Sequence, residues 1–214
     1  MRKYITDDED SIRPIHRPLW HAAEEKLYEA KAAIDKMAVA KDRIQYEAGW
    51  TQFIDSLEEF WVRFYAEGND LFTNFQPWAG KVESERKSEQ LLQYLYQARH
   101  QSQHGMVAVQ WGPSYHTFGK GFSGIEYGTV VYSDGTYDAA LVPMGPQSSN
   151  SFVQRMHGDP QLPIIENKRY KQAYHPPRVF QGKTLNGPSP VTVARLAHSF
   201  YAEVLTKAKA KFGQ

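Results

Sequence analysis

The sequence predicts an α+β fold, a mainly helical up-and-down bundle with a small antiparallel β insertion before its last helix. Apolar residues recur every three or four positions in the first half of the chain and again near its end, which is the period of amphipathic helices. Between these regions, two apolar runs flank a turn that contains glycine, a pattern typical of a β-hairpin. The 214 residues therefore divide into an irregular arm (1–18), a helical core (19–105 and 188–212) and a β insertion (106–187).

The first predicted helix follows an aperiodic segment that contains Pro14 and Pro18. From there on, apolar side chains recur at helical spacing with Glu and Lys between them: Leu19, Ala23, Leu27, Ala30, Ile34 and Met37. We expect an amphipathic helix of about five turns.

A second helix is predicted from Asp42, whose side chain can cap it, with Gln45 completing a capping box. Gly68-Asn69-Asp70 is its predicted end. Its apolar stripe is strongly aromatic: Trp50, Phe53, Ile54, Leu57, Phe60, Trp61 and Phe64. We interpret this stripe as core packing between helices rather than a stacking platform.

The third predicted helix opens with residues 84–87, after a loop through Pro77, Trp78 and Gly80, and ends at Gly105. Its predicted buried side consists of Leu91, Leu92, Leu95 and Ala98.

The β insertion is predicted from residues 129–132 and 137–142, which flank the turn 133–136. Residues 143–163 are turn-rich and read as a loop. The closing helix starts with Ser189 as N-cap and Pro190 in the first turn.

Composition and charge exclude several classes of protein. The chain has no cysteine, which removes disulfides, cysteine-based zinc sites and a thiol nucleophile. No apolar run approaches the ~18 residues of a membrane span, and we expect a cytoplasmic protein. Residues 155–214 carry a charge of +7 and residues 1–154 carry −6. The basic part can attract a polyanion, or it can face the acidic part of its own or a second copy.

The third predicted helix ends in the run YLYQARHQSQHG, residues 94–105, in which Arg99 and His104 enclose four residues. This run resembles the motif of the HEPN superfamily, an Arg and a His four to six residues apart near the end of a helix. That family most often has Asn, less often Asp or His, where this chain has His100. The resemblance covers about residues 19–105 and 188–212 and implies a compact helical bundle that forms a homodimer.

The resemblance also implies metal-independent RNA cleavage, in which the ribose 2′-OH attacks the neighbouring phosphate. His104 would be the acid or base, because the pKa of histidine is near neutral. Arg99 would stabilise the phosphoryl oxygens with its planar, permanently charged fork. His100 would orient the phosphate or His104. No cofactor and no metal is expected, and a toxin or phage-defence role with an antitoxin or other protein partner follows from the resemblance alone.

Further residues are expected around this site. We expect Lys168, Arg169 and Lys171 in the basic part to contact RNA. Glu58 or Glu59 of the second helix would pair with Arg99 if the helices pack antiparallel.

Other interpretations stay open at this point. Five residues at about 100° each place Arg99 and His104 on different faces of a regular helix, whereas His100 and His104 share one face. These two histidines could hold a metal with a distant third ligand such as His116, His157 or Glu58. Alternatively, they are polar residues that satisfy a helix end. A non-catalytic module that binds a nucleotide or protein through Arg99 and His104 is the second function considered, and an Arg99 buried against an acid of its own chain would favour it.

Overall fold

A computed structural model describes residues 19–103, 109–111, 115–118, 124–131, 137–144, 153–156, 158–167 and 171–213, with only the backbone described for the four strands between 112 and 157. The chain forms two compact units, one of Met1–Met106 with Ile164–Gln214 and one of Val107–Pro163. We expected the second segment of the helical unit to begin at 188, and it begins at 164.

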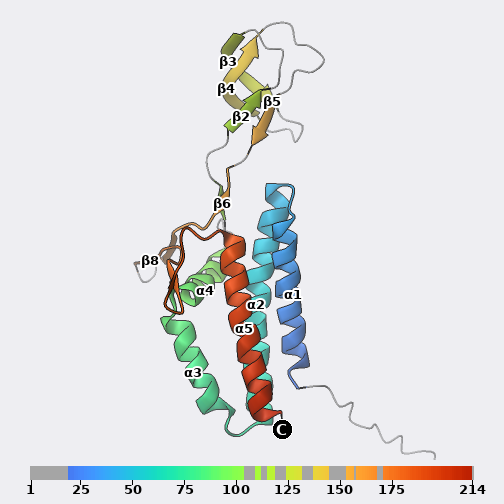
Figure 1. Cartoon of the computed structure of the whole chain (residues 1–214), viewed down its shortest axis with the longest axis vertical. Helices are drawn as coiled ribbons and strands as arrows, with labels where there is room; N and C mark the ends of the chain where they lie inside the picture. Colours follow the sequence, from blue (N-terminus) through green and yellow to red (C-terminus); the bar gives the residue numbers. More distant parts are fainter. Residues whose placement is uncertain are drawn as a thin grey trace, which may run out of the picture. The chain divides into compact units, whose positions relative to one another are not determined.

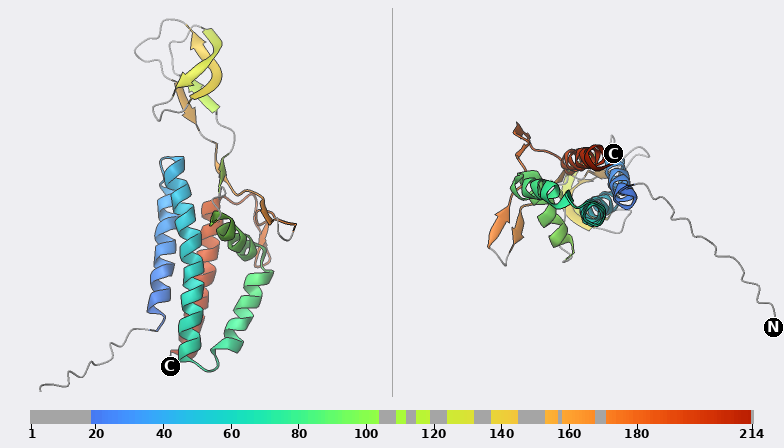
Figure 2. Two further views of the ribbon diagram at one scale, coloured as in Figure 1. Left: turned by 180° about the vertical axis from the view of Figure 1, so that it is seen from behind. Right: turned by 90° about the horizontal axis from the view of Figure 1, so that it is seen from below.

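The larger unit contains the helices of the described chain, which are α1 (His21–Ala38), α2 (Arg43–Leu71), α3 (Phe75–Ser88), α4 (Gln90–Ser102) and α5 (Pro190–Phe212). Figures 1 and 2 show α1, α2 and α5 lying side by side along their length. Helix α4 packs against α2, α3 and α5. The closing helix therefore returns to the first helices, as the sequence predicts.

Two predicted helix starts are confirmed by their caps. The Asp42 carboxylate accepts a hydrogen bond from the Gln45 backbone N–H over 2.8 Å. The Gln45 side chain reaches back one residue further than in a standard capping box and accepts from the Lys41 N–H at 3.3 Å. At α5, the Ser189 hydroxyl accepts from the Thr192 N–H at 3.2 Å, with Pro190 in the first turn.

The predicted order of three helices before the β insertion is wrong, because four helices precede it in the described part of the chain. The expected loop through Pro77, Trp78 and Gly80 lies within α3, which also contains the predicted helix start at 84–87, and a break at Glu89 separates α3 from α4. Pro77 is only the third residue of α3, where its missing N–H has no partner within the helix to lose. Phe75, Ala79 and Val82 form the buried side of α3.

The aromatic stripe of α2 lies in the core, as the sequence predicts, because all of its seven side chains are buried. It continues into a cluster of rings at the end of the bundle. Trp20, which is fully buried, stacks on Phe64 and donates its indole N–H to the Phe64 carbonyl at 3.2 Å. Phe75 and Phe212 complete this cluster, with their ring centroids 5.7 Å apart. The cluster ties α2, α3 and α5 together through apolar contact.

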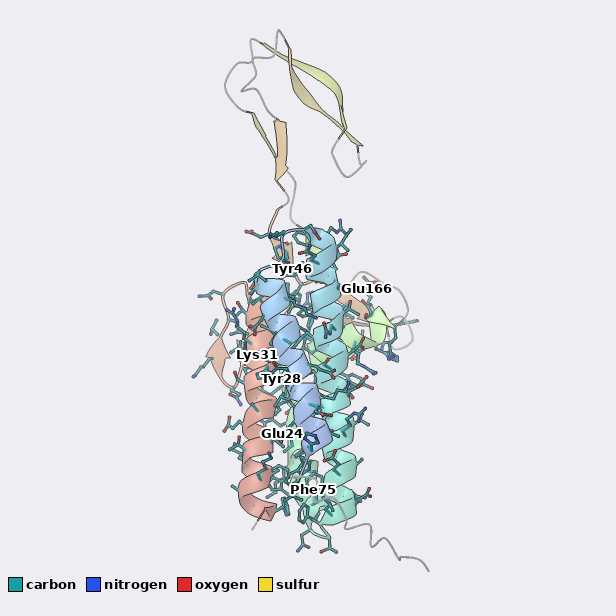
Figure 3. The ribbon with its side chains drawn as sticks, turned by 90° about the vertical axis from the view of Figure 1, so that its right-hand side faces the viewer. Glu24, Tyr28, Lys31, Tyr46, Phe75 and Glu166 are labelled. Carbon is teal, nitrogen blue, oxygen red and sulfur yellow. The ribbon has the colours of Figure 1, made fainter. Side chains whose placement is uncertain are left out.

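Charged side chains on the surface of α1 form ion pairs both within the helix and with the neighbouring helix α5. Figure 3 shows Glu24, Tyr28 and Lys31 along α1. Lys31 pairs with Asp35 at 2.6 Å, and Glu24 accepts a hydrogen bond from Lys209 of α5. Tyr28 is 77% exposed. Within the described ranges, each helix is too short or too polar to span a lipid bilayer.

The strands are short, and each pairs antiparallel with one other strand. Those of the smaller unit are β1 (Gln110–Trp111), β2 (Tyr115–Phe118), β3 (Gly124–Val131), β4 (Tyr137–Met144), β5 (Val153–Met156) and β6 (Pro160–Gln161). The predicted hairpin is the β3–β4 pair, with Val131 opposite Tyr137. The expected loop at 143–163 contains β5, which pairs with β2, and β6, which pairs with β1.

The remaining strands belong to the helical unit. They are β7 (Ile165–Asn167), β8 (Gln172–Tyr174), β9 (Val179–Phe180) and β10 (Lys183–Thr184). Strands β7, β8 and β9 contact α4. The Gln101 amide donates to the Glu166 carbonyl at 3.1 Å, and the Gln90 side chain accepts from the Arg178 N–H at 2.9 Å. This layer therefore extends along α4 from its first residue to its last turn.

Candidate functional site

The candidate site begins at the C-terminal end of α4, where Arg99 and His100 lie in the last turn. The helix ends at Ser102, three residues before the predicted end at Gly105. The Gln103 N–H donates to the Arg99 carbonyl at 3.2 Å and closes the turn. Three of the predicted site residues, His104, Lys168 and Arg169, lie outside the described residues.

Arg99 is half-buried, with 28% of its side chain exposed. Its Nε lies 3.5 Å from Oδ1 of Asp55 on α2. Among the described residues this Nε has no hydrogen-bond partner, although it is itself buried. The two groups therefore attract each other as charges without a formed hydrogen bond.

Asp55 is a site residue that the sequence analysis missed. Burial raises the pKa of its carboxyl group above the ordinary value, and the Arg99 charge opposes this shift while the Glu59 charge adds to it. Asp55 precedes Glu58 and Glu59 by one helical turn on α2. The available signal was this spacing, because residues three and four apart on a helix share a face.

Glu58, an expected partner of Arg99, binds a different arginine. It accepts from Arg86 of α3 at 2.7 Å. The Arg86 guanidinium also donates to the Tyr201 hydroxyl at 2.7 Å and to Glu83 at 3.1 Å. Its centre lies 4.3 Å from the centroid of the Trp61 ring. Glu58 thus belongs to a buried network that joins α2, α3 and α5.

Glu59, the other expected partner, pairs with Lys26 of α1 at 2.9 Å. The hydrogen bond from Lys26 lowers the pKa of the Glu59 carboxyl, and the more distant Arg99 charge acts in the same direction. Glu59 therefore lies within the electrostatic influence of Arg99 while its own ion pair is with α1.

The other described site residues lie in the same unit. His100 is exposed on α4. Lys171 is exposed, has a left-handed backbone with φ of 51°, and directly precedes β8 in the layer that packs on α4. In the part of the chain that the structure describes, no three His, Asp or Glu side chains converge to hold a metal ion.

Comparisons with known proteins identified no protein similar to this chain. No protein-family model matches the chain, and neither the curated proteins nor the solved structures contain a significant match.

Proposed function

We propose that the chain is a metal-independent endoribonuclease that acts as a homodimer with a HEPN-like site around Arg99. The observation that carries this proposal is the state of Arg99, a guanidinium at the end of α4 that is 28% exposed and attracted to Asp55 without a hydrogen bond. An arginine has five N–H donors. Because the Asp55 contact involves only Nε, the two terminal nitrogens of the guanidinium can donate to phosphate oxygens.

The proposed reaction uses two groups of the motif, Arg99 and His104, together with a base. Arg99 binds the non-bridging oxygens of the scissile phosphate and stabilises the charge that develops on them. A base removes the proton of the 2′-OH, whose oxygen forms a new bond to phosphorus. The bond from phosphorus to the 5′-oxygen breaks, and His104 donates a proton to that oxygen. The products are a 2′,3′-cyclic phosphate and a 5′-hydroxyl.

Asp55 acts on this reaction through Arg99. Its carboxylate attracts the Nε side of the guanidinium, which leaves the two terminal nitrogens for phosphate oxygens. In this proposal Asp55 is a positioning residue, and Lys168, Arg169 and Lys171 supply positive charge for the RNA backbone.

The testing experiment is cleavage of total RNA in EDTA by wild type, Arg99→Ala and His104→Ala at equal oligomeric state. Both variants should lose about 100-fold or more in rate, as expected for removal of a phosphate-binding cation or a general acid. The control is Arg43→Ala, an exposed arginine paired with Glu47 at the start of α2, which should cleave like wild type. Cleavage by Arg99→Ala at the wild-type rate would contradict the proposal.

The second candidate function is non-catalytic binding of a nucleotide or protein through Arg99 and His104. One observation favours it, because Arg99 pairs with Asp55 of its own chain and needs no second copy for charge balance. A folded dimer that cleaves neither total RNA nor a panel of tRNAs would support this function over cleavage. In either case we propose a cytoplasmic protein, and a toxin or phage-defence role with a protein partner belongs to the first function.

A further inference from the structure

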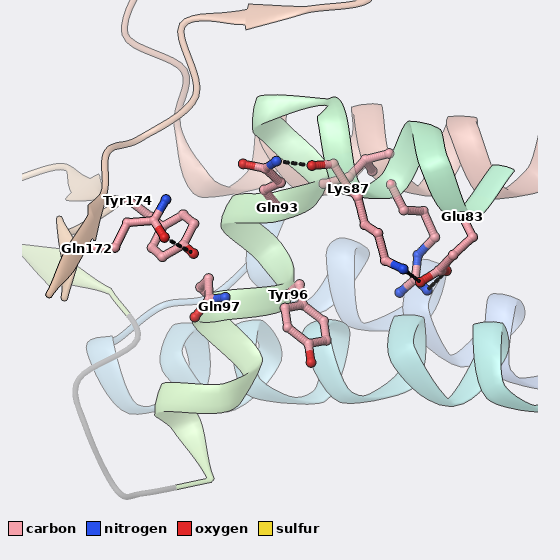
Figure 4. A pocket seen from close by; sticks show the side chains of 9 residues that line it. Glu83, Lys87, Gln93, Tyr96, Gln97, Gln172 and Tyr174 are labelled. Atoms are coloured by element: carbon pink, nitrogen blue, oxygen red, sulfur yellow. Dashed lines mark hydrogen bonds and ion pairs between the residues drawn. The ribbon is translucent and has the colours of Figure 1, made fainter. Parts of the chain in front are cut away.

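A cavity of about 450 Å³ lies beside α4, and neither Arg99 nor Asp55 is among the residues that line it. Figure 4 shows that its walls come from the end of α3, one side of α4 and strand β8. Its volume falls within the range of about 300–1,000 Å³ that is typical of small-molecule sites.

The charged wall of this cavity is neutralised by its own pairs. Glu83 accepts from Arg86 at 3.1 Å and from Lys87 at 3.2 Å. Arg86 is also paired with Glu58, and only 10% of its side chain is exposed. Two cations and two carboxylates thus balance one another, and the wall does not attract an anion such as phosphate.

The second wall consists of carboxamides that are held in fixed orientations. Gln93 donates to the Lys87 carbonyl, and the Gln97 oxygen accepts from Asn167 at 3.3 Å. The Gln172 oxygen accepts from the Tyr174 hydroxyl at 2.9 Å. Within the described part of the chain, these bonds leave the Gln93 oxygen as an acceptor and the amino groups of Gln97 and Gln172 as donors.

Two tyrosine rings also line the cavity, Tyr96 from α4 and Tyr174 from β8, beside the apolar side chain of Leu92. Tyr96 is 52% exposed, although it lies on a helix that packs against three others. Together the rings and amides offer flat apolar surface beside paired hydrogen-bond donors and acceptors (Figure 4).

We propose that this cavity binds an uncharged nucleobase, supplied either by a free nucleoside or by an unpaired position of RNA. The Gln93 oxygen and the amino groups of Gln97 and Gln172 together offer one acceptor and two donors, which can pair with the mixed donors and acceptors on the edge of a base. Bases stack on tyrosine rings irrespective of their sequence. A sugar without a base is disfavoured, because the carboxylate it would use, Glu83, is already bound to two cations. Binding here is independent of cleavage at Arg99, because none of the cavity residues named belongs to the proposed reaction.

The experiment is a calorimetric titration of the full chain with uridine, cytidine, adenosine and guanosine. At least one nucleoside should bind, and Tyr96→Ala and Gln172→Ala should each weaken it by about tenfold, the effect of one lost stacking or paired contact. Both positions are exposed, so these variants should keep the helical circular dichroism of wild type. The matched control is Tyr28→Ala, an exposed tyrosine of α1, which should leave the affinity unchanged.

Two further probes distinguish the source of the base. Single-stranded 2′-O-methyl tetranucleotides cannot undergo 2′-OH attack, so they report binding without cleavage. Affinity about tenfold above that of the nucleosides indicates an RNA base, and equal affinity indicates a free nucleoside. Nucleoside 5′-monophosphates should bind within about threefold of nucleosides, because the cavity is neutral.

Three results would overturn the proposal. They are no saturable binding of nucleosides or tetranucleotides up to about 10 mM, affinities unchanged in both cavity variants, and binding by ribose alone or only when a phosphate is present.

Discussion

Arg86 on α3 donates to Glu58 on α2 over 2.7 Å, and only 10% and 17% of these two side chains are exposed. The same Arg86 guanidinium also donates to the Tyr201 hydroxyl of α5 and packs against the Trp61 ring. Charge removed from water to this extent is costly unless it is fully paired. The network therefore fixes how α2, α3 and α5 pack, and two of its members, Arg86 and Glu83, line the cavity beside α4.

The first prediction concerns this network. Arg86→Met leaves the Glu58 carboxylate buried without its main partner, and we expect the free energy of unfolding to fall by about 3–5 kcal/mol. Urea denaturation measures this change. The double variant Arg86→Met/Glu58→Met should lose less than the sum of the two single variants. Additive losses would show that the pair does not act as a unit.

The matched control for Arg86 is Arg43→Met at the surface. Arg43 pairs with Glu47 at 2.7 Å, but about half of its side chain is exposed. Such pairs contribute about 0–1 kcal/mol, so the unfolding free energy should hardly change.

A second prediction compares two glycines. Gly68 is buried in α2, and a Cβ atom there would overlap the Phe75 ring of α3. Gly68→Ala should therefore lower the melting temperature and destabilise the protein by about 1–3 kcal/mol. Gly80 lies inside α3 with no atom near the position of its missing Cβ.

At Gly80, substitution by alanine should change the stability in the opposite direction. Gly80→Ala should stabilise the protein by about 0.5–1 kcal/mol, because alanine loses less backbone entropy on forming a helix. A loss of stability at Gly80, or none at Gly68, would contradict the described packing of α3.

The third prediction is that His198 on α5 makes the free energy of unfolding depend on pH. Burial lowers the pKa of His198, a hydrogen bond with the Leu27 carbonyl at 3.2 Å partly offsets this, and Lys31 and Asp35 act in opposite directions. The unfolded chain takes up this proton near the ordinary pKa of 6.5, before the folded chain does. The stability contributed by neutral His198 is present above pH 6.5 and is lost as the pH falls through the lower folded pKa.

Urea denaturation between pH 7.5 and 5.5 tests His198. His198→Gln should lose less stability over this interval than wild type, because it has no proton to bind. An identical decline in both proteins would refute the assignment.

The fourth prediction separates positioning from stability at Asp55. Its carboxyl is 44% exposed and its pKa is raised by burial, so Asp55→Asn should change the unfolding free energy by only about 1 kcal/mol or less. If Asp55 orients Arg99 for the proposed reaction, the same variant should cleave RNA about tenfold more slowly. Asp35→Asn, which breaks the exposed pair with Lys31, should have neither effect. A fully active Asp55→Asn would exclude the positioning role.

Much of the fold could be predicted because the local sequence patterns, such as helix caps and turns, specify the same elements that tertiary packing stabilises. Asp42 and Ser189 cap α2 and α5 through their own backbone neighbours, and the aromatic stripe of α2 faces the core. The β3–β4 hairpin follows from two apolar runs on either side of a glycine turn. In each case the residues that determine the element lie within it.

Helix α3 could not be predicted from its own sequence. Pro77 and Gly80 are loop signals, and the packing of the buried side of α3 against the rest of the bundle outweighs them. The strands at 165–184 were missed for a similar reason, because their hydrogen bonds go to Gln90 and Gln101 of α4 as well as to one another.

The candidate site could be predicted only where the motif is local. Arg99 and His100 lie on adjacent positions of one helix, so their proximity follows from the sequence. Which carboxylate of α2 meets Arg99 depends on how two helices cross, and the side chain in contact is Asp55 rather than Glu58 or Glu59. The cavity joins residues about 80 positions apart and has no sequence signature.

The most direct test of the central claim is the chemistry of the RNA ends produced in EDTA. Attack by the 2′-OH predicts 2′,3′-cyclic phosphate and 5′-hydroxyl ends from wild type, and none above background from Arg99→Ala. Ends that carry a 5′-phosphate, or equal cleavage by wild type and Arg99→Ala, would contradict a ribonuclease site at Arg99.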